Sequence, residues 1–283
     1  MTEEEFYKEA FDRNRGLILA ETQKKFRKTR IAIPGTGGAG GVYTTTLARL
    51  GIGAFHIADF DTFSLANFNR QAGAMMSTID KQKQDVMEGM IRDINPYAHI
   101  ATFGEIQKEN IDDFLDGVDI VVDGMDFFQI DVRRMIFKSA YKKGIPVITA
   151  APLGFGSAVH IFDKHSMTFD DYFNINDGMS YREKIIPFGI GTTPALLKSV
   201  YMPLATLALK EKCSSSSIMG RLTCANFVAT EVYKIIDGLP YEVSSISFPY
   251  YPYVKKIKRT NLWFWNRQPF QPFKKWYFSK KVQ

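Results

Sequence analysis

Glycines and one carboxylate in the first quarter of the chain have the types and spacing of a nucleotide-binding turn. The pattern G-x-G-G-x-G is formed by Gly35, Gly37, Gly38 and Gly40, and Asp59 ends the next apolar run. Glycines lack the β-carbon that would keep backbone amides away from a phosphate, and a helix start offers unpaired amides and a positive dipole end. A carboxylate at the end of the following strand can accept hydrogen bonds from a ribose. The spacing therefore predicts a site for a nucleotide.

The elements that would position these residues follow from the surrounding pattern. An apolar run over 31–34 precedes the glycines, a helix-like stretch over 42–50 follows them, and a second apolar run covers 54–59. Strand, turn, helix and strand in this order open a doubly wound nucleotide-binding fold. Further strands are predicted over 99–103, 118–123 and 145–150, alternating with helices over 81–94, 110–115 and 130–143. This alternation implies a parallel sheet.

The pattern changes after Gly156. A strand is predicted over 157–162, and residues 164–193 are polar and read as a long irregular loop. Helices are predicted over 194–210 and 222–236, and two strand-like runs over 241–248 and 250–257 would form a hairpin. The predicted fold class is therefore α/β, with a doubly wound, mostly parallel, Rossmann-like sheet and a C-terminal antiparallel extension.

Composition excludes several classes of protein. No run of about 18 apolar residues occurs, so no membrane-spanning helix is predicted, and the acidic start of the chain argues against a secretory signal. The net charge is +6, but the basic residues are spread over several segments, which favours a solvated basic surface over a nucleic-acid site. The two cysteines cannot form a four-cysteine zinc site. Together these features predict a cytoplasmic protein.

Three charged residues beyond Asp59 favour a triphosphate ligand. Arg70 and Lys83 follow in the chain, and Asp126 comes just after the fourth predicted strand. An arginine fork fixes phosphate geometry, and a lysine supplies a point charge. A carboxylate at the carboxyl end of a parallel strand faces the ligand crevice, where it can hold Mg²⁺ together with waters and phosphates. We therefore expect ATP and Mg²⁺ as cofactors, with Asp126 as the metal ligand.

The full set of motifs resembles the ThiF/MoeB superfamily, the bacterial relatives of ubiquitin-activating enzymes. The resemblance covers about 8–163, with a weaker echo over 219–237. It is carried by the glycine pattern, D-x-D at Asp59 and Asp61, N-x-x-R-Q from Asn67 to Gln71, Lys83 and Asp126. Two features depart from many members: the chain has no CxxC pairs for a structural zinc, and Asp80 and Phe127 replace a frequent glycine and asparagine. Branches without the zinc pairs include the tRNA threonylcarbamoyladenosine dehydratases and enzymes that modify ribosomal peptides.

The resemblance implies a role for each matching residue. Asp59 would bind the ATP ribose, Arg70 the triphosphate oxygens, and Lys83 the phosphates, while Asp126 is associated with magnesium and adenylation. Arg13 matches an arginine that the family's homodimer lends to the neighbouring ATP site. The predicted catalytic residues are thus Arg70, Lys83, Asp126 and Arg13. The predicted cofactor-binding residues are Gly35, Gly37, Gly38, Gly40, Asp59, Asp61, Asn67 and Gln71.

The implied reaction is adenylation of a carboxylate with release of pyrophosphate, by a homodimer. The acceptor stays open among a ubiquitin-like C-terminus, a peptide, a small carboxylate and a tRNA base; an RNA partner has no further support. The implied organisation is an N-terminal helical segment over 1–28 and an ATP-binding core over 29–163. Residues 164–283 would add a lid or insertion, interface helices and a C-terminal β and aromatic extension of the same domain.

Several alternatives stay open. The glycines and Asp59 also suit an NAD(P)-dependent oxidoreductase, although that reading leaves Arg70 and Lys83 unexplained, and a catalytically silent scaffold would keep the same fold. Asp61 either touches ATP or steadies its loop. Cys213 is a candidate nucleophile in a loop, whereas Cys224 lies on an apolar helix face and is expected in the core.

Overall fold

The computed structural model describes residues 1–192, 207–208, 213–244, 246–257, 259–261, 273, 275–276 and 280. The chain divides into two units. The first comprises Met1–Met125 and Ala225–Tyr241, and the second comprises Asp126–Cys224 and Glu242–Gln283. In the described ranges, no helix is both long enough and apolar enough to span a bilayer.

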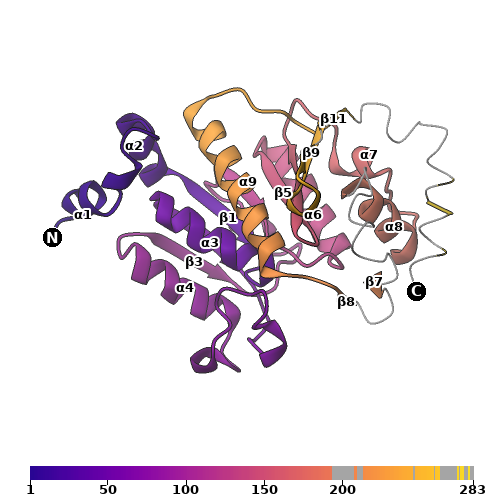
Figure 1. The fold of residues 1–283 in the computed structure, drawn as a ribbon, viewed down its shortest axis with the longest axis horizontal. Coiled ribbons are helices and arrows are strands. Elements are labelled where there is room, and N and C mark those ends of the chain that lie inside the picture. The colour runs from indigo at the N-terminus through magenta and orange to yellow at the C-terminus, as the bar shows by residue number, and fades with distance from the viewer. Residues whose placement is uncertain are drawn as a thin grey trace. The chain divides into compact units, whose positions relative to one another are not determined.

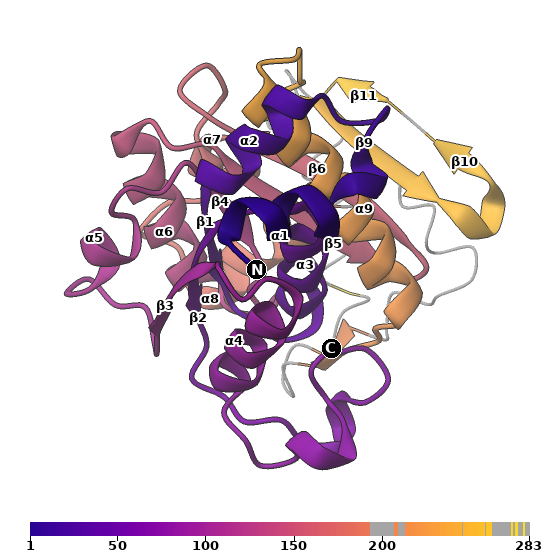
Figure 2. The same ribbon diagram turned by 90° about the vertical axis from the view of Figure 1, so that its left-hand side faces the viewer.

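Four parallel strands form the sheet of the first unit. They are β1 (Arg30–Pro34), β2 (Ala54–Ala58), β3 (His99–Phe103) and β4 (Ile120–Asp123), in the order β4-β1-β2-β3. Figure 1 labels β1 and β3, and Figure 2 labels all four. Ile31 pairs with Phe55 on one side and with Ile120 on the other. The side chains of β4 are all buried, as expected for an inner parallel strand.

Helices flank this sheet. α3 (Gly38–Leu50) packs against β1 and β4, and α4 (Lys83–Ile94) packs against α3, β2 and β3, so that α3 and α4 lie side by side (Figures 1 and 2). α5 (Ile111–Phe114) precedes β4. α1 (Glu3–Ala10) and α2 (Ala20–Lys28) form the N-terminal segment.

The end of α9 contacts the N-terminal segment within the first unit. α9 (Ile218–Asp237) belongs to this unit from Ala225 onward. Asp237 near its end accepts a hydrogen bond from the Thr22 hydroxyl at 2.5 Å, and Phe26 of α2 meets Tyr233 edge to face.

The second unit contains an antiparallel sheet. β5 (Val147–Leu153) and β6 (Gly156–Phe162) form a hairpin, and β9 (Ile246–Tyr251) pairs with β6. β10 (Lys256–Ile257) and β11 (Thr260–Asn261) both pair with β9, and β7 (Leu207–Ala208) pairs separately with β8 (Cys213–Ser214). Its helices are α6 (Ile130–Lys143), α7 (Phe169–Phe173) and α8 (Tyr181–Thr192).

The predicted fold class is confirmed: a parallel sheet with antiparallel C-terminal strands and helices around it. The predicted helix over 130–143 has the observed bounds, because Gly144 adopts the left-handed conformation that ends a helix. A C-terminal hairpin is present, but its predicted position is wrong: β9 continues through the expected turn at Pro249, and the chain turns over Pro252–Val254 before β10. The functional division at residues 28 and 163 stays a prediction.

The irregular loop predicted over 164–193 is wrong. This segment forms α7 and α8, because Phe169, Phe173 and Phe188 are buried against one another and against β6. The acidic and amide residues between the two helices are typical of a loop, so the spacing of the phenylalanines was not recognised as helical.

Two further local predictions need correction. The helix predicted over 81–94 begins at Lys83, because Asp80 has a left-handed φ of 63° and Gln82 is the residue that precedes α4. The helix expected over 194–210 falls mostly outside the described residues, and its described part, Leu207–Ala208, is a strand.

Candidate functional site

Two glycines of the turn, Gly35 and Gly40, are packed so tightly that no side chain would fit at either position. Gly35 has a left-handed φ of 80°, and a β-carbon there would lie 2.8 Å from the carbonyl oxygen of Gly124, just beyond β4. A β-carbon on Gly40 would lie 1.7 Å from the carbonyl oxygen of Gly35. Gly37 caps α3, whose first amides have no acceptor within the helix. The turn therefore presents bare backbone at a helix N-terminus, as an anion requires.

Asp59 is fixed beside this turn. Its Oδ2 accepts hydrogen bonds from the Thr36 amide at 2.7 Å and from the Thr36 hydroxyl at 3.2 Å, and its Oδ1 accepts the Asp61 amide at 3.0 Å. The Gly35 amide donates to the Ala58 carbonyl at 2.7 Å, which brings the end of β2 to the turn. A carboxylate has about four acceptor positions, so three internal bonds leave one for a ligand hydroxyl.

A second contact extends this chain of hydrogen bonds to Lys83. The Lys83 ammonium donates to Asp61 Oδ2 at 2.8 Å, and its amide donates to the Asp61 carbonyl at 2.9 Å. The Lys83 side chain is only 8% exposed, whereas that of Asp61 is 56% exposed. The ammonium has three donors, so it can reach an added anion without leaving Asp61.

Gln71 places an unsatisfied acceptor next to the turn. Gln71 is 9% exposed, and its side-chain Oε1 has no hydrogen-bond partner in the described part of the chain. A β-carbon on Gly37 would lie 3.4 Å from that oxygen, so the amide group faces the start of α3. A buried oxygen without a donor is unfavourable by about 1–3 kcal/mol, and a ligand donor would remove this cost.

The residues before Gln71 shape the loop that carries it. Asn67 Oδ1 accepts the Ser64 amide at 3.0 Å, and the carbonyl of Asn67 accepts the amides of Arg70 and Gln71, both at 3.0 Å. Arg70 Nη1 donates to the Ala66 carbonyl at 2.8 Å. These bonds place the guanidinium and the Gln71 amide on one turn, with Arg70 half-buried.

Two aspartates lie after β4. Asp123 is its last residue, is 4% exposed, and accepts the Met125 amide at 3.1 Å. Asp126 begins the second unit, where its Oδ1 accepts the Phe128 amide at 3.0 Å and its carbonyl accepts Arg133 Nη2 at 3.0 Å. The role of Asp126 toward a metal stays a prediction.

Magnesium binding with a nucleotide stays a prediction. In the described ranges, no group of three or more His, Cys, Asp or Glu side chains is placed to hold a metal. Mg²⁺ is usually held by one or two carboxylates together with waters and substrate phosphates. The bare turn, the Lys83 ammonium and the unsatisfied Gln71 oxygen all fit a bound nucleotide.

Arg13 and the cysteines complete the predicted set. Arg13 is exposed in a 3₁₀ turn (Asp12–Asn14), and its guanidinium has no ion-pair partner in the described structure. Cys224 is fully buried on α9, as predicted, with its Sγ 3.1 Å from Ser157 Oγ. Cys213 lies in β8; its side chain falls outside the described residues.

Sequence reasoning missed two contributors to the site. Thr36 is fully buried and holds Asp59 through both its amide and its hydroxyl. Gly124 packs against the turn, since a β-carbon there would lie 2.2 Å from the Gly35 carbonyl oxygen. Two features of the sequence could have indicated these residues: a threonine lies inside the glycine pattern, and an Asp-Gly pair ends a buried strand.

Comparison with known proteins agrees with this fold. The model of the ThiF family matches residues 11–272, so the chain belongs to the ThiF family. This match confirms the resemblance found in the sequence and gives no support to an oxidoreductase.

Two curated relatives illustrate the range of the family. The chain is 32% identical over 142 residues to the tRNA threonylcarbamoyladenosine dehydratase of Bacillus subtilis, covering 50% of this chain and 55% of that protein. It is 27% identical over 244 residues to the molybdopterin-synthase adenylyltransferase of Haemophilus influenzae, covering 83% and 93%. The chain thus spans about half the length of the dehydratases that it matches.

Solved structures share the fold over a longer stretch. The crystal structure of PaaA matches with a TM-score of 0.67 at 20% identity, covering 93% of this chain and 75% of that one. The structure of Escherichia coli MccB with MccA matches with a TM-score of 0.63 at 18% identity, covering 86% and 66%. At these identities the similarity establishes the fold alone.

Proposed function

We propose that the protein is an ATP-dependent adenylyltransferase that activates a carboxylate as an acyl-adenylate. The observation that carries the proposal is the continuous set of contacts from the glycine turn through Thr36, Asp59 and Asp61 to Lys83. The buried Gln71 amide oxygen beside Gly37 adds a polar group without an internal partner. Family membership supports the same activity.

In the proposed reaction, a substrate carboxylate oxygen attacks the α-phosphorus. A bond forms between them, and the bond from that phosphorus to the bridging oxygen breaks, so pyrophosphate leaves with the electron pair. The amides at the start of α3, the Lys83 ammonium and the Arg70 guanidinium stabilise the negative charge on the phosphates. Magnesium held by Asp126 would neutralise further phosphate charge. Catalysis would consist mainly of positioning and charge stabilisation.

We also propose that the active form is a homodimer in which Arg13 serves the ATP site of the partner subunit. Its support is an exposed guanidinium that forms no ion pair with the described residues, followed a few positions along the chain by Leu17 and Leu19, which are 84% and 67% exposed. Exposed apolar side chains next to an unpaired charge are typical of a contact surface.

The substrate is proposed only as a class. MccB was solved with the peptide MccA, and the dehydratase relatives are named for a modified tRNA base. A peptide C-terminus, a small carboxylate and a tRNA-linked carboxylate are therefore the candidate substrates for this chain.

A two-part experiment tests the proposal. The melting temperature is measured with ATP and Mg²⁺ or with NADH, and pyrophosphate release is then screened with peptides, small carboxylates and tRNA. We expect a higher melting temperature with ATP and Mg²⁺ alone, and release that depends on one substrate class. Stabilisation by NADH would contradict the nucleotide assignment. ATP binding without release for any substrate would favour a silent scaffold.

A further inference from the structure

The second unit contains a hollow whose lining includes none of the residues of the nucleotide turn. It lies between residues of α6, α7 and β6, opens partly to solvent, and has a volume of about 260 Å³. Its floor consists of Phe137, Phe162 and Phe169, whose ring centroids lie 4.6 to 5.7 Å apart. Each of the three residues is at most 4% exposed. Water finds no hydrogen-bond partner on such a floor, so an apolar group would displace it favourably.

The rim of the hollow is positively charged. Lys138 and Lys142 lie one turn apart on α6 and are exposed, and neither forms an ion pair with a carboxylate of the described chain. Arg134 and Asp170 also line the rim. Three cations and one carboxylate line the hollow, and Asp177, which also accepts a hydrogen bond from Arg134, reduces the local excess to one positive charge. Lys138 and Lys142 supply this excess, because Arg134 is paired with Asp170 and Asp177.

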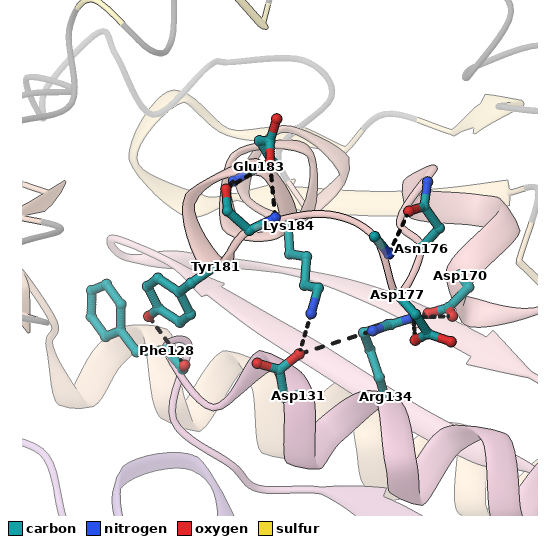
Figure 3. A network of polar contacts seen from close by, with 11 residues as sticks. Phe128, Asp131, Arg134, Asp170, Asn176, Asp177, Tyr181, Glu183 and Lys184 are labelled. Carbon is teal, nitrogen blue, oxygen red and sulfur yellow. Dashed lines mark hydrogen bonds and ion pairs between the residues drawn. The ribbon is translucent and has the colours of Figure 1, made fainter.

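Polar contacts fix α6 to α7 and α8 beside the hollow (Figure 3). Arg134 donates two parallel hydrogen bonds to the Asp170 carboxylate at 2.7 and 2.6 Å, and a third to Asp177 at 2.8 Å. Lys184 of α8 donates to Asp131 of α6 at 2.8 Å. The bidentate pair fixes α7 against α6, and the Arg134 hydrogen bond lowers the pKa of the Asp177 carboxyl below its usual value. A preformed hollow does not need to be ordered when a ligand binds.

We propose that this hollow binds a small aromatic monocarboxylate. The ring would lie on the phenylalanine floor, and the carboxylate would pair with the ammonium groups of Lys138 and Lys142. An amine of the same shape would be repelled by the rim, and a neutral amide would lose the charge attraction. The volume suits a ligand of roughly ten non-hydrogen atoms, for which an affinity on the order of 0.1–1 mM is expected. This site goes beyond the adenylation chemistry proposed above.

The test compares three ligands of nearly the same shape on the full chain. Phenylacetate, phenylacetamide and phenethylamine are titrated at low ionic strength, with binding followed by ligand-observed NMR. We expect phenylacetate to bind about fivefold more tightly than the amide and the amine not to bind, because each exposed ion pair contributes modestly. Added salt should weaken only the acid. Equal binding of acid and amide, or no binding of the acid, would overturn the proposal.

Variants locate the site. The double variant Lys138→Gln, Lys142→Gln should lower the affinity for phenylacetate to that for the amide and leave the amide affinity unchanged. Lys143→Gln is the matched control, since Lys143 follows on the same helix but does not line the hollow. Unchanged phenylacetate binding in the double variant would refute the assignment. ATP binding by the double variant should equal that of the native chain, so failure here is distinguishable from failure of the adenylation proposal.

Discussion

Lys83 illustrates how single residues prepare the candidate site before any nucleotide binds. Its ammonium is nearly buried, yet Asp61, its carboxylate partner among the described residues, is more than half exposed. The pair is therefore held in position as much by the hydrogen bond that the Lys83 backbone amide donates to the Asp61 carbonyl as by charge. Asp61 acts on Lys83 in the structure described, so its part in nucleotide binding would run through that lysine.

Replacing Lys83 should weaken nucleotide binding without unfolding the protein. We expect Lys83→Ala to lower the affinity for ATP and Mg²⁺ by about 10- to 100-fold, since a hydrogen bond to a charged group is lost. Stability should change little, because the Asp61 carboxylate left behind remains hydrated. Isothermal titration calorimetry measures the affinity, with the exposed Lys81→Ala as control. Native affinity in Lys83→Ala would remove this lysine from the site.

Replacing Gln71 should weaken nucleotide binding without lowering the stability of the protein. We expect Gln71→Met to leave the free energy of unfolding unchanged or to raise it by about 1 kcal/mol, because an unsatisfied buried oxygen is removed. Its affinity for ATP should fall about tenfold. Urea unfolding and calorimetry measure the two quantities.

A matched glutamine provides the control for that variant. Gln23 has both ends bonded, to Asn14 and to the Leu50 carbonyl, so Gln23→Met should destabilise the protein. If Gln71→Met were destabilising to the same extent, the Gln71 amide would have a structural partner after all, and its assignment to the nucleotide would lose support.

Asp126 is expected to act in the chemical step. In Asp126→Asn the amide oxygen can still accept the Phe128 amide, so the local turn should survive while the charge is lost. We expect pyrophosphate release to fall by about 100-fold or more with ATP affinity within a few-fold of native, as for a group that stabilises the transition state. Asp116→Asn, at an exposed position, is the control. Undiminished release would contradict a metal-binding role.

At the scale of elements, β6 and α7 share a core that is sensitive to acid. His160 of β6 is fully buried against the rings of Tyr172 and Phe173, and neither of its ring nitrogens has a partner among the described residues. Burial lowers the pKa of His160 from 6.5 to about 4. The folded protein therefore holds this ring neutral over a range where the unfolded chain would protonate it.

This difference predicts a loss of stability as the pH falls. Below pH 6.5 the unfolded chain binds a proton that the folded protein does not, so the free energy of unfolding decreases until the pH reaches about 4. His160 alone should contribute a loss of about 2 kcal/mol between pH 7.5 and 5. Urea unfolding at both pH values measures it. In His160→Leu this part of the pH dependence should disappear; an identical slope in native and variant chains would contradict the burial argument.

At the scale of the whole molecule, the proposed homodimer predicts that two inactive variants can restore activity to each other when they are mixed. Arg13→Ala and Lys83→Ala should each lower pyrophosphate release, and mixing the two variants should restore part of it. A mixed dimer would contain one site with a native Arg13 from one subunit and a native Lys83 from the other. The activity of mixed and unmixed samples is compared at equal protein concentration. No recovery on mixing, with subunit exchange shown by differently tagged chains, would count against a shared site.

Much of the fold was predictable because its signals are local. The glycine turn, the helix ending at Gly144 and the strand over 99–103 depend on residues close in the chain. The helices α7 and α8 were not predictable in this way. Their stability comes from Phe169, Phe173 and Phe188 packing on β6 and on each other, and tertiary burial overrides the weak helix signal of a polar segment.

The sequence by itself determined that a bare glycine turn precedes a helix and that Asp59 ends the next strand, because both follow from spacing along the chain. Only the tertiary structure decided that Gln71 faces Gly37, that Gly124 closes on Gly35, and that Lys83 pairs with Asp61. These contacts join segments that are distant in sequence, and they exist because the register of the parallel strands brings their carboxyl ends to one edge of the sheet.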